Sequence, residues 1–101
     1  MRTIKRSFQF KTDYKRELKG SHAKTIDADL RAVITLLASD SQLPERYRDH
    51  ALTGNWGEAR DIHIHPDLVL VYAKPVDKGK GNKDLQILRL ERIGAHSELK
   101  L

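Results

Sequence analysis

Side chains that can exchange protons gather in the second part of the chain. An imidazole titrates at about pH 6.5, so at neutral pH one histidine can accept a proton while another donates one. Four of the five histidines lie in a predicted loop or at predicted strand ends, with two aspartates among them: His50, Asp61, His63, His65, Asp67 and His96. This pattern indicates general acid–base chemistry.

RNA suits such chemistry because each ribose carries its own nucleophile, the 2′-hydroxyl beside the phosphate. Cleavage needs a base at that oxygen, a cation beside the charge developing on phosphorus, and an acid at the departing 5′-oxygen. Each proton transfer is worth roughly 10²–10⁴-fold in rate. Histidines beside Arg60, Arg89 and Arg92 would suffice without a cofactor. Asp67 could orient an imidazole or hold the proton itself, and spacing does not choose between these roles.

Two other interpretations of the same residues stay open. His63 and His65 alternate with apolar residues and therefore share one strand face, which could begin a metal site. Asp61, Asp67 or His96 would then have to supply a third ligand, and the sequence has no recognised metal-ligand spacing. A small metal-dependent hydrolase is one alternative. The other is that these histidines are only the solvated polar face of a strand.

Several kinds of site are excluded by residue type. The chain has no cysteine, which removes disulfide scaffolds and thiolate metal sites. It has no glycine-rich phosphate loop of the Walker or Rossmann type. It also lacks a serine in a nucleophile-elbow setting, so covalent acyl chemistry is not expected.

Size and charge point to one basic domain. The 101 residues, 39% hydrophobic and 33% charged, predict a single domain spanning 1–101. The first residues lead into no signal-peptide-like apolar stretch, and no run approaches the roughly 20 apolar residues that cross a bilayer. We therefore expect a soluble cytoplasmic protein without a membrane partner. Its net charge of +5 favours polyanionic partners, of which nucleic acid is the commonest.

Hydrophobic periodicity predicts an α+β fold. Apolar residues at intervals of four, Phe10, Tyr14 and Leu18, indicate a first helix, and a broad apolar stripe indicates a second over 24–39. Residues 40–59 read as a long loop with at most one helical turn, and 77–83 as a flexible hairpin loop. Predicted strands cover 3–6, 61–65, 68–72 and 85–90. A strand and a two-helix hairpin packed on an antiparallel sheet follow from this order.

Four segments in the second half then carry a family likeness. The chain resembles the YafQ branch of the RelE superfamily of bacterial toxins, and the helical first half fits that fold as well. The segments are Arg48-Asp49-His50-Ala51-Leu52-Thr53-Gly54-Asn55-Trp56, Arg60-Asp61-Ile62-His63-Ile64-His65-Pro66-Asp67, Leu70-Val71-Tyr72 and Leu90-Glu91-Arg92-Ile93-Gly94-Ala95-His96.

The resemblance implies a ribosome-dependent messenger RNA endonuclease. Such toxins cut mRNA in the A site of the 70S ribosome without metal or other cofactor. A cognate antitoxin, usually a DinJ-like ribbon-helix-helix protein, wraps the toxin, and only that complex binds operator DNA. By position, the resemblance makes the acid–base set His50, His63, Asp67 and His96, with Asp61, Arg60 and Arg92 in support. The alternative is a non-catalytic RNA- or ribosome-binding module that kept the fold.

The chain departs from the family pattern at three places. Ala51 stands where a proline often follows the loop histidine, and Leu68 stands where a tryptophan is common. Lys100 replaces a terminal aromatic residue that could stack on a base. We expect Lys100 and Arg89 to contact RNA phosphate instead. The segment 79–83 is longer than usual in the family.

Overall fold

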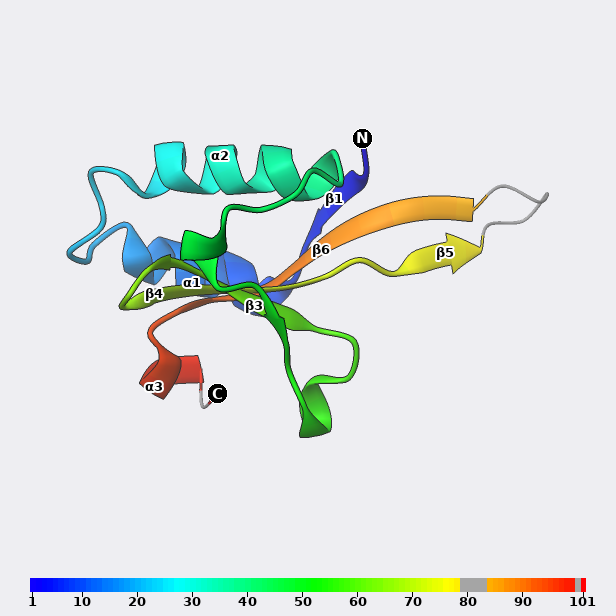
Figure 1. Ribbon diagram of the computed structural model, residues 1–101. Coiled ribbons are helices and arrows are strands. Elements are labelled where there is room, and N and C mark those ends of the chain that lie inside the picture. Colours follow the sequence, from blue (N-terminus) through cyan, green and yellow to red (C-terminus); the bar gives the residue numbers. More distant parts are fainter. Residues whose placement is uncertain (79–83, 100) are drawn as a thin grey trace.

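Three helices, six strands and two short 3-10 turns make up the computed structural model, which describes residues 1–78, 84–99 and 101 (Figure 1). In chain order the elements are β1 (Thr3–Arg6), α1 (Phe8–Glu17), α2 (Ile26–Ala38), η1 (Glu45–Tyr47), β2 (His50–Ala51), η2 (Gly54–Trp56), β3 (Arg60–His65), β4 (Leu68–Ala73), β5 (Val76–Lys78), β6 (Asp84–Gly94) and α3 (His96–Leu99). No helix in the described part of the chain is long and apolar enough to span a membrane.

The sheet confirms the α+β prediction with one difference. Its strand order is β1-β6-β4-β3-β2, and β5 pairs with the outer part of β6. The pairs among β2, β3, β4 and β6 are antiparallel, whereas β1 runs parallel to β6. The sheet is therefore mixed, and the long stretch of chain between β1 and β6 serves as the connection that a parallel pair requires.

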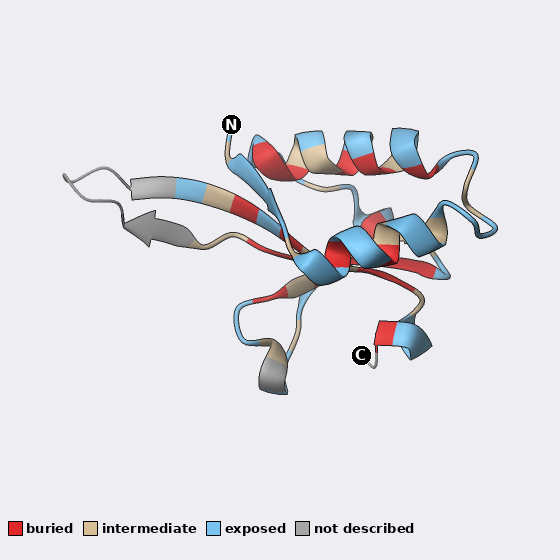
Figure 2. Ribbon diagram, turned by 180° about the vertical axis from the view of Figure 1, so that it is seen from behind, coloured by how far each residue is buried: buried red, intermediate tan, exposed pale blue. Residues whose placement is uncertain are grey.

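Both long helices cover one face of this sheet. The hydroxyl of Ser7 accepts a hydrogen bond from the Phe10 N–H at 2.9 Å and so caps the start of α1. The apolar stripe of α2 is buried against the sheet, as Figure 2 shows by its red inner face. This main core contains Phe10, Ile26, Leu30, Val33, Leu37, Ala38, Tyr47, Ile62, Leu68, Leu70, Tyr72, Leu88, Leu90 and Ile93.

A smaller apolar cluster lies on the opposite face. Val69 and Val71 of β4 contact Leu99 of α3 and Ala59 there, with Leu52, Trp56 and Leu101 partly buried around them. Strand β4 is buried along its whole length, as expected for a central strand covered on both faces. The helix α3 was not predicted, because four residues are too few to show a helical period.

The two predicted loops contain more regular structure than their composition suggests. Residues 40–59 hold η1, η2 and the two-residue strand β2, and Arg48 turns the chain into β2 with a φ of 50°. In the predicted hairpin loop 77–83, Asp77 and Lys78 belong to β5. Residues 79–83 lie outside the described part of the chain.

Candidate active site

Three histidines surround one buried carboxylate on the sheet face opposite the long helices. Pairing of β2 with β3 sets His50 opposite Asp61, and the Nδ1 of His50 lies 2.8 Å from Asp61 Oδ1. The Nε2 of His96, from α3, lies 3.6 Å from the other oxygen of the same carboxylate. The His63 ring lies 4.9 Å from that of His96 and 6.3 Å from that of His50, centroid to centroid. The fold thus brings together residues from a stretch of 47 sequence positions, His50 to His96.

Asp61 is the least exposed member of this His–Asp cluster, which we define as His50, Asp61, His63 and His96. Its side chain is fully buried, whereas those of His50 and His96 are 52% and 49% exposed. Neither oxygen of Asp61 accepts a hydrogen bond from a described residue. A buried carboxylate without hydrogen bonds is costly unless charge of opposite sign lies beside it. The imidazoles can supply that charge when they carry a proton.

The backbone fixes the tautomer of His50. Its Nδ1 donates a hydrogen bond to the carbonyl oxygen of Arg48, 3.0 Å away. A carbonyl only accepts, so Nδ1 must carry a hydrogen, and in the neutral ring Nε2 is then the nitrogen with a free lone pair. His50 is therefore prepared to accept a proton at Nε2 from a bound molecule.

His63 lies deeper than the other two histidines. Burial lowers the pKa of His63 below its ordinary value, and the nearby Asp61 carboxylate opposes this effect. The rings of His96 and His50 and the guanidinium of Arg48 lower it further. Its Nδ1 is buried without a hydrogen-bond partner in the described residues. These surroundings favour a neutral imidazole at pH 7.

The structure places Asp67 away from this cluster. Asp67 lies in the β3–β4 turn with its side chain 66% exposed, and its Oδ1 is 2.8 Å from Nε2 of His22. The hydrogen bond from His22 lowers the pKa of Asp67 below its usual range. The His–Asp cluster is thus assembled without Asp67.

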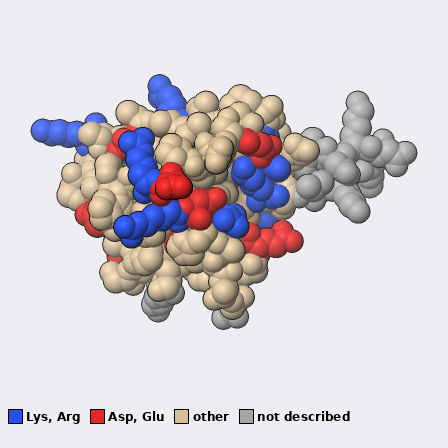
Figure 3. Space-filling view, viewed as in Figure 1, with Lys and Arg blue, Asp and Glu red and all other residues tan. Residues whose placement is uncertain are grey.

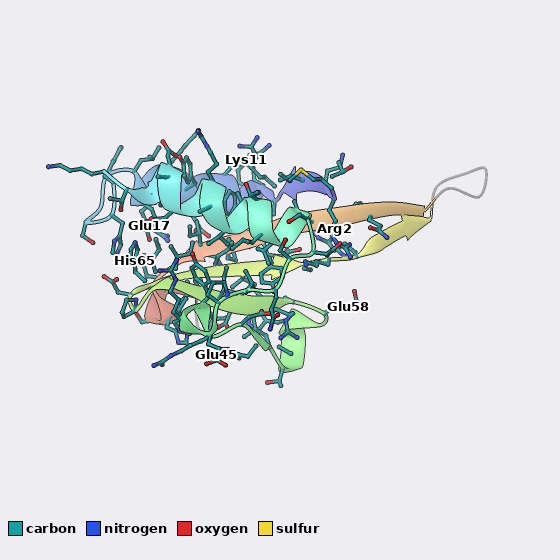
Figure 4. The ribbon with its side chains drawn as sticks, turned by 45° about the horizontal axis from the view of Figure 1, so that its top comes forward. Arg2, Lys11, Glu17, Glu45, Glu58 and His65 are labelled. Carbon is teal, nitrogen blue, oxygen red and sulfur yellow. The ribbon has the colours of Figure 1, made fainter. Side chains whose placement is uncertain are left out.

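The prediction that His65 shares a face with His63 is wrong. A β-bulge between His63 and His65 shifts the register of β3 against β4 and breaks the alternation. Nε2 of His65 instead lies 2.7 Å from Asp29 of α2, and its ring stacks on that of His22 at 4.5 Å. His65 is labelled in Figure 4, near the start of α2.

The three predicted arginines are engaged by carboxylates. Nε of Arg60 donates to Asp49 at 3.0 Å, and Nε of Arg89 lies 2.6 Å from Glu91. Two guanidinium nitrogens of Arg92, Nε and Nη2, donate to the buried Asp13 at 2.6 and 3.1 Å. Lys100 lies outside the described residues.

A cation that the sequence did not single out lies beside His63 of the cluster. Arg48 and Arg46 line a cleft of about 540 Å³ together with His63, His65 and Pro66. Arg48 is exposed, and no ion pair joins it to another described residue. In the sequence, the position of Arg48 two residues before His50 was the feature that could have indicated its place in the site. On the face shown in Figure 3, basic and acidic side chains alternate instead of forming one continuous basic surface.

The described residues offer no ready metal site. Across 1–78, 84–99 and 101, no three His, Asp or Glu side chains converge so that they could hold a metal ion. Within the cluster, one nitrogen of His50 is already bonded to the Arg48 carbonyl. The arrangement is suited to moving protons among imidazoles beside a buried carboxylate.

Similar proteins agree in sequence and in structure. A curated relative, mRNA interferase toxin YafQ of Escherichia coli, is 35% identical over 98 residues, which are 95% of this chain and 97% of that protein. The crystal structure of the E. coli DinJ–YafQ complex matches with a TM-score of 0.72 and 31% identity over 98% of each chain. A copper-bound mutant toxin from Helicobacter pylori matches with a TM-score of 0.76 and 33% identity, covering 98% and 99% of the two chains.

The family match spans almost the whole sequence. Residues 2–101 fit the family described as "Bacterial toxin of type II toxin-antitoxin system, YafQ". The fold, the His–Asp cluster and the relatives therefore lead to one assignment: the chain belongs to the YafQ family of bacterial toxins.

Proposed function

We propose that this protein is the toxin of a type II toxin–antitoxin module and an endoribonuclease that cuts mRNA on the ribosome. The observation that carries the proposal is the His–Asp cluster, in which three imidazoles share one buried carboxylate on an accessible face. The E. coli relative named mRNA interferase supports the choice of substrate.

In the proposed reaction, His63 is the general base. Because burial keeps its ring neutral, it accepts the proton of the ribose 2′-hydroxyl as that oxygen attacks the adjacent phosphorus. The bond from phosphorus to the 5′-oxygen breaks, leaving a 2′,3′-cyclic phosphate. A protonated His96 or His50 donates a proton to the departing 5′-oxygen. Asp61 balances the positive charge on whichever ring holds the proton, and Arg48 stabilises the charge on phosphorus.

Asp67 remains in the proposed acid–base set. From the β3–β4 turn its exposed carboxylate can approach the ribose or the leaving group of a bound message, while His22 keeps it ionised. Arg89 and Lys100 are proposed to contact RNA phosphates.

The proposal needs no metal for the chemical step, since base, acid and cation all come from side chains. Its partners would be the 70S ribosome with mRNA in the A site, and an antitoxin of the DinJ kind that brings the toxin to operator DNA. The DinJ–YafQ complex of E. coli supports the antitoxin, and the charge of +5 suits an acidic partner or RNA.

The test is primer extension on a defined message in a reconstituted translation system, with and without ribosomes. We expect in-frame cuts only with ribosomes present, and none with His96→Ala. A chelator selective for zinc and copper, which leaves Mg²⁺ for the ribosome, should not change the rate. Melting temperature and antitoxin binding of the variant must match the wild type.

The two alternative functions predict different outcomes in this assay. Ribosome binding without cuts would identify a non-catalytic binding module. Cuts that disappear with the chelator and return with zinc would identify a metal-dependent hydrolase instead.

A further inference from the structure

The helix that carries His96 is too short to hold itself in place. Helix α3 has four residues at the end of the chain, and an isolated single turn is unstable in water. Leu99 anchors one side of it in the smaller apolar cluster. His96 is the first residue of α3, so its orientation depends on how the preceding turn is fixed.

Glu98 fixes that turn through both of its carboxylate oxygens. Oε1 accepts a hydrogen bond from the Ala95 N–H at 3.3 Å, which closes the turn around His96. Oε2 lies 3.1 Å from Nε of Arg16 in α1, far away in the sequence. Figure 1 shows α1 and α3 at the same end of the sheet, on its two sides.

Arg16 also holds the end of β6 that leads into α3. Its Nη2 donates to the Ile93 carbonyl at 3.2 Å, and its Nη1 lies 3.4 Å from the buried Asp13, which accepts the Ile93 N–H at 3.2 Å. A Cβ at Gly94 would lie 2.7 Å from Nη2 of Arg16, so glycine lets this guanidinium keep its position without shifting. Helix α1 therefore holds the segment 93–98 before and after His96.

We propose that Arg16 and Glu98 are positioning residues that hold His96 against the Asp61 carboxylate. The proposal rests on the proposed function, since it assigns these residues a part in that reaction. Both side chains are 43% exposed, so the ion pair itself adds little stability. Its effect is on geometry: a displacement of about 1 Å can cost about 10²-fold in rate.

The test compares Glu98→Gln, Arg16→Met and the double variant in single-turnover cleavage on programmed ribosomes. Glutamine keeps an oxygen for the Ala95 N–H and removes the charge that attracts Arg16. We expect each single variant to lower kcat about 10-fold with KM within about 2-fold, and the double variant to be no slower than either one. Asp40→Asn is the control, because in the same way it removes the charge of an exposed carboxylate, which pairs with Arg2 at 2.8 Å and with Lys74 at 2.9 Å. We expect its kcat to be unchanged.

A structural readout separates positioning from a loss of stability. In NMR spectra of the free protein, the ring C–H signals of His96 should shift in all three variants and stay in place in Asp40→Asn. The proposal is overturned if kcat follows melting temperature alone, if the two effects multiply to about 100-fold, or if the His96 signals do not move. Absence of cleavage by the wild-type protein would instead count against the proposed function, and the His96 signals would still decide the positioning role.

Discussion

His50 and Asp61 lie 2.8 Å apart without a hydrogen bond between them, because the Nδ1–H of His50 is given to the carbonyl oxygen of Arg48. The Asp61 carboxylate therefore lies buried beside three imidazoles without accepting a hydrogen bond from a described residue. An aspartate that served only to orient His50 would accept that N–H itself. This arrangement supports the proposal that Asp61 acts through its charge, by stabilising a proton on the rings beside it.

Replacing Asp61 by asparagine should separate charge from shape. Asp61→Asn keeps the volume and removes the charge, so we expect a loss of about 10²-fold in single-turnover cleavage. The free energy of unfolding should change by less than about 1 kcal/mol, since the cost of burying the charge disappears together with its attraction to the imidazoles. Cleavage and urea unfolding measured on the same preparation test both parts. Activity within about 2-fold of wild type would contradict the role of the charge.

Protonation of His63 should make the protein less stable in acid. Burial lowers the pKa of His63 in the folded state, so below about pH 6.5 the unfolded chain binds a proton there that the folded chain resists. The free energy of unfolding must then fall as pH decreases from about 6.5 towards the folded pKa, while above about pH 6.5 the residue contributes no slope. Urea unfolding at several pH values should show this slope in the wild type and a smaller one in His63→Gln. Equal slopes in both proteins would disprove it.

The helices and strands were easier to predict from the sequence than the contacts between them. The stripe of α2 and the apolar run of β4 predicted buried elements correctly, because periodicity is a local property. The contact of His50 with Asp61 depends on a two-residue strand, and two residues carry no periodic signal. The likeness to the toxin family supplied His50, His63 and His96 as one set. It ranked Asp61 below Asp67, although the structure puts Asp61 at the centre of the cluster.

The β-bulge at the end of β3 explains why the predicted orientation of His65 was wrong. Alternation placed His63 and His65 on one face, and one extra residue is enough to send His65 to α2. The residue types in β3 do not indicate the bulge, because it arises from the pairing of β3 with β4. For the same reason, the ion pair of Asp67 with His22 joins two turns whose proximity only the assembled fold establishes.

The two partners in that ion pair give a direct test of Asp67. Asp67→Asn removes the negative charge from the 2.8 Å ion pair and His22→Asn removes its imidazole, so a purely structural pair predicts similar effects on cleavage. We expect Asp67→Asn to lower the cleavage rate at least about 10-fold, as for a group that exchanges a proton with substrate, and His22→Asn to lower it less than about 2-fold. Rates from both variants, each folded as judged by circular dichroism, make the comparison. Equal losses of cleavage rate in the two variants would show that Asp67 only stabilises the β3–β4 turn.

Arg48 and Arg60 give a matched pair for the cation in the reaction. Arg60 is bound to Asp49, which also accepts a 2.6 Å hydrogen bond from the Tyr72 hydroxyl, so its charge is already balanced. Arg48 has no such partner among the described residues and lines the cleft beside His63. We expect Arg48→Met to slow single-turnover cleavage about 10- to 100-fold and Arg60→Met less than about 3-fold. Arg60→Met should instead reduce the free energy of unfolding by about 1 kcal/mol, because its removal leaves a half-buried carboxylate with one donor fewer. If Arg60→Met slowed cleavage more than Arg48→Met, the cation in the reaction would be Arg60, as the sequence predicted.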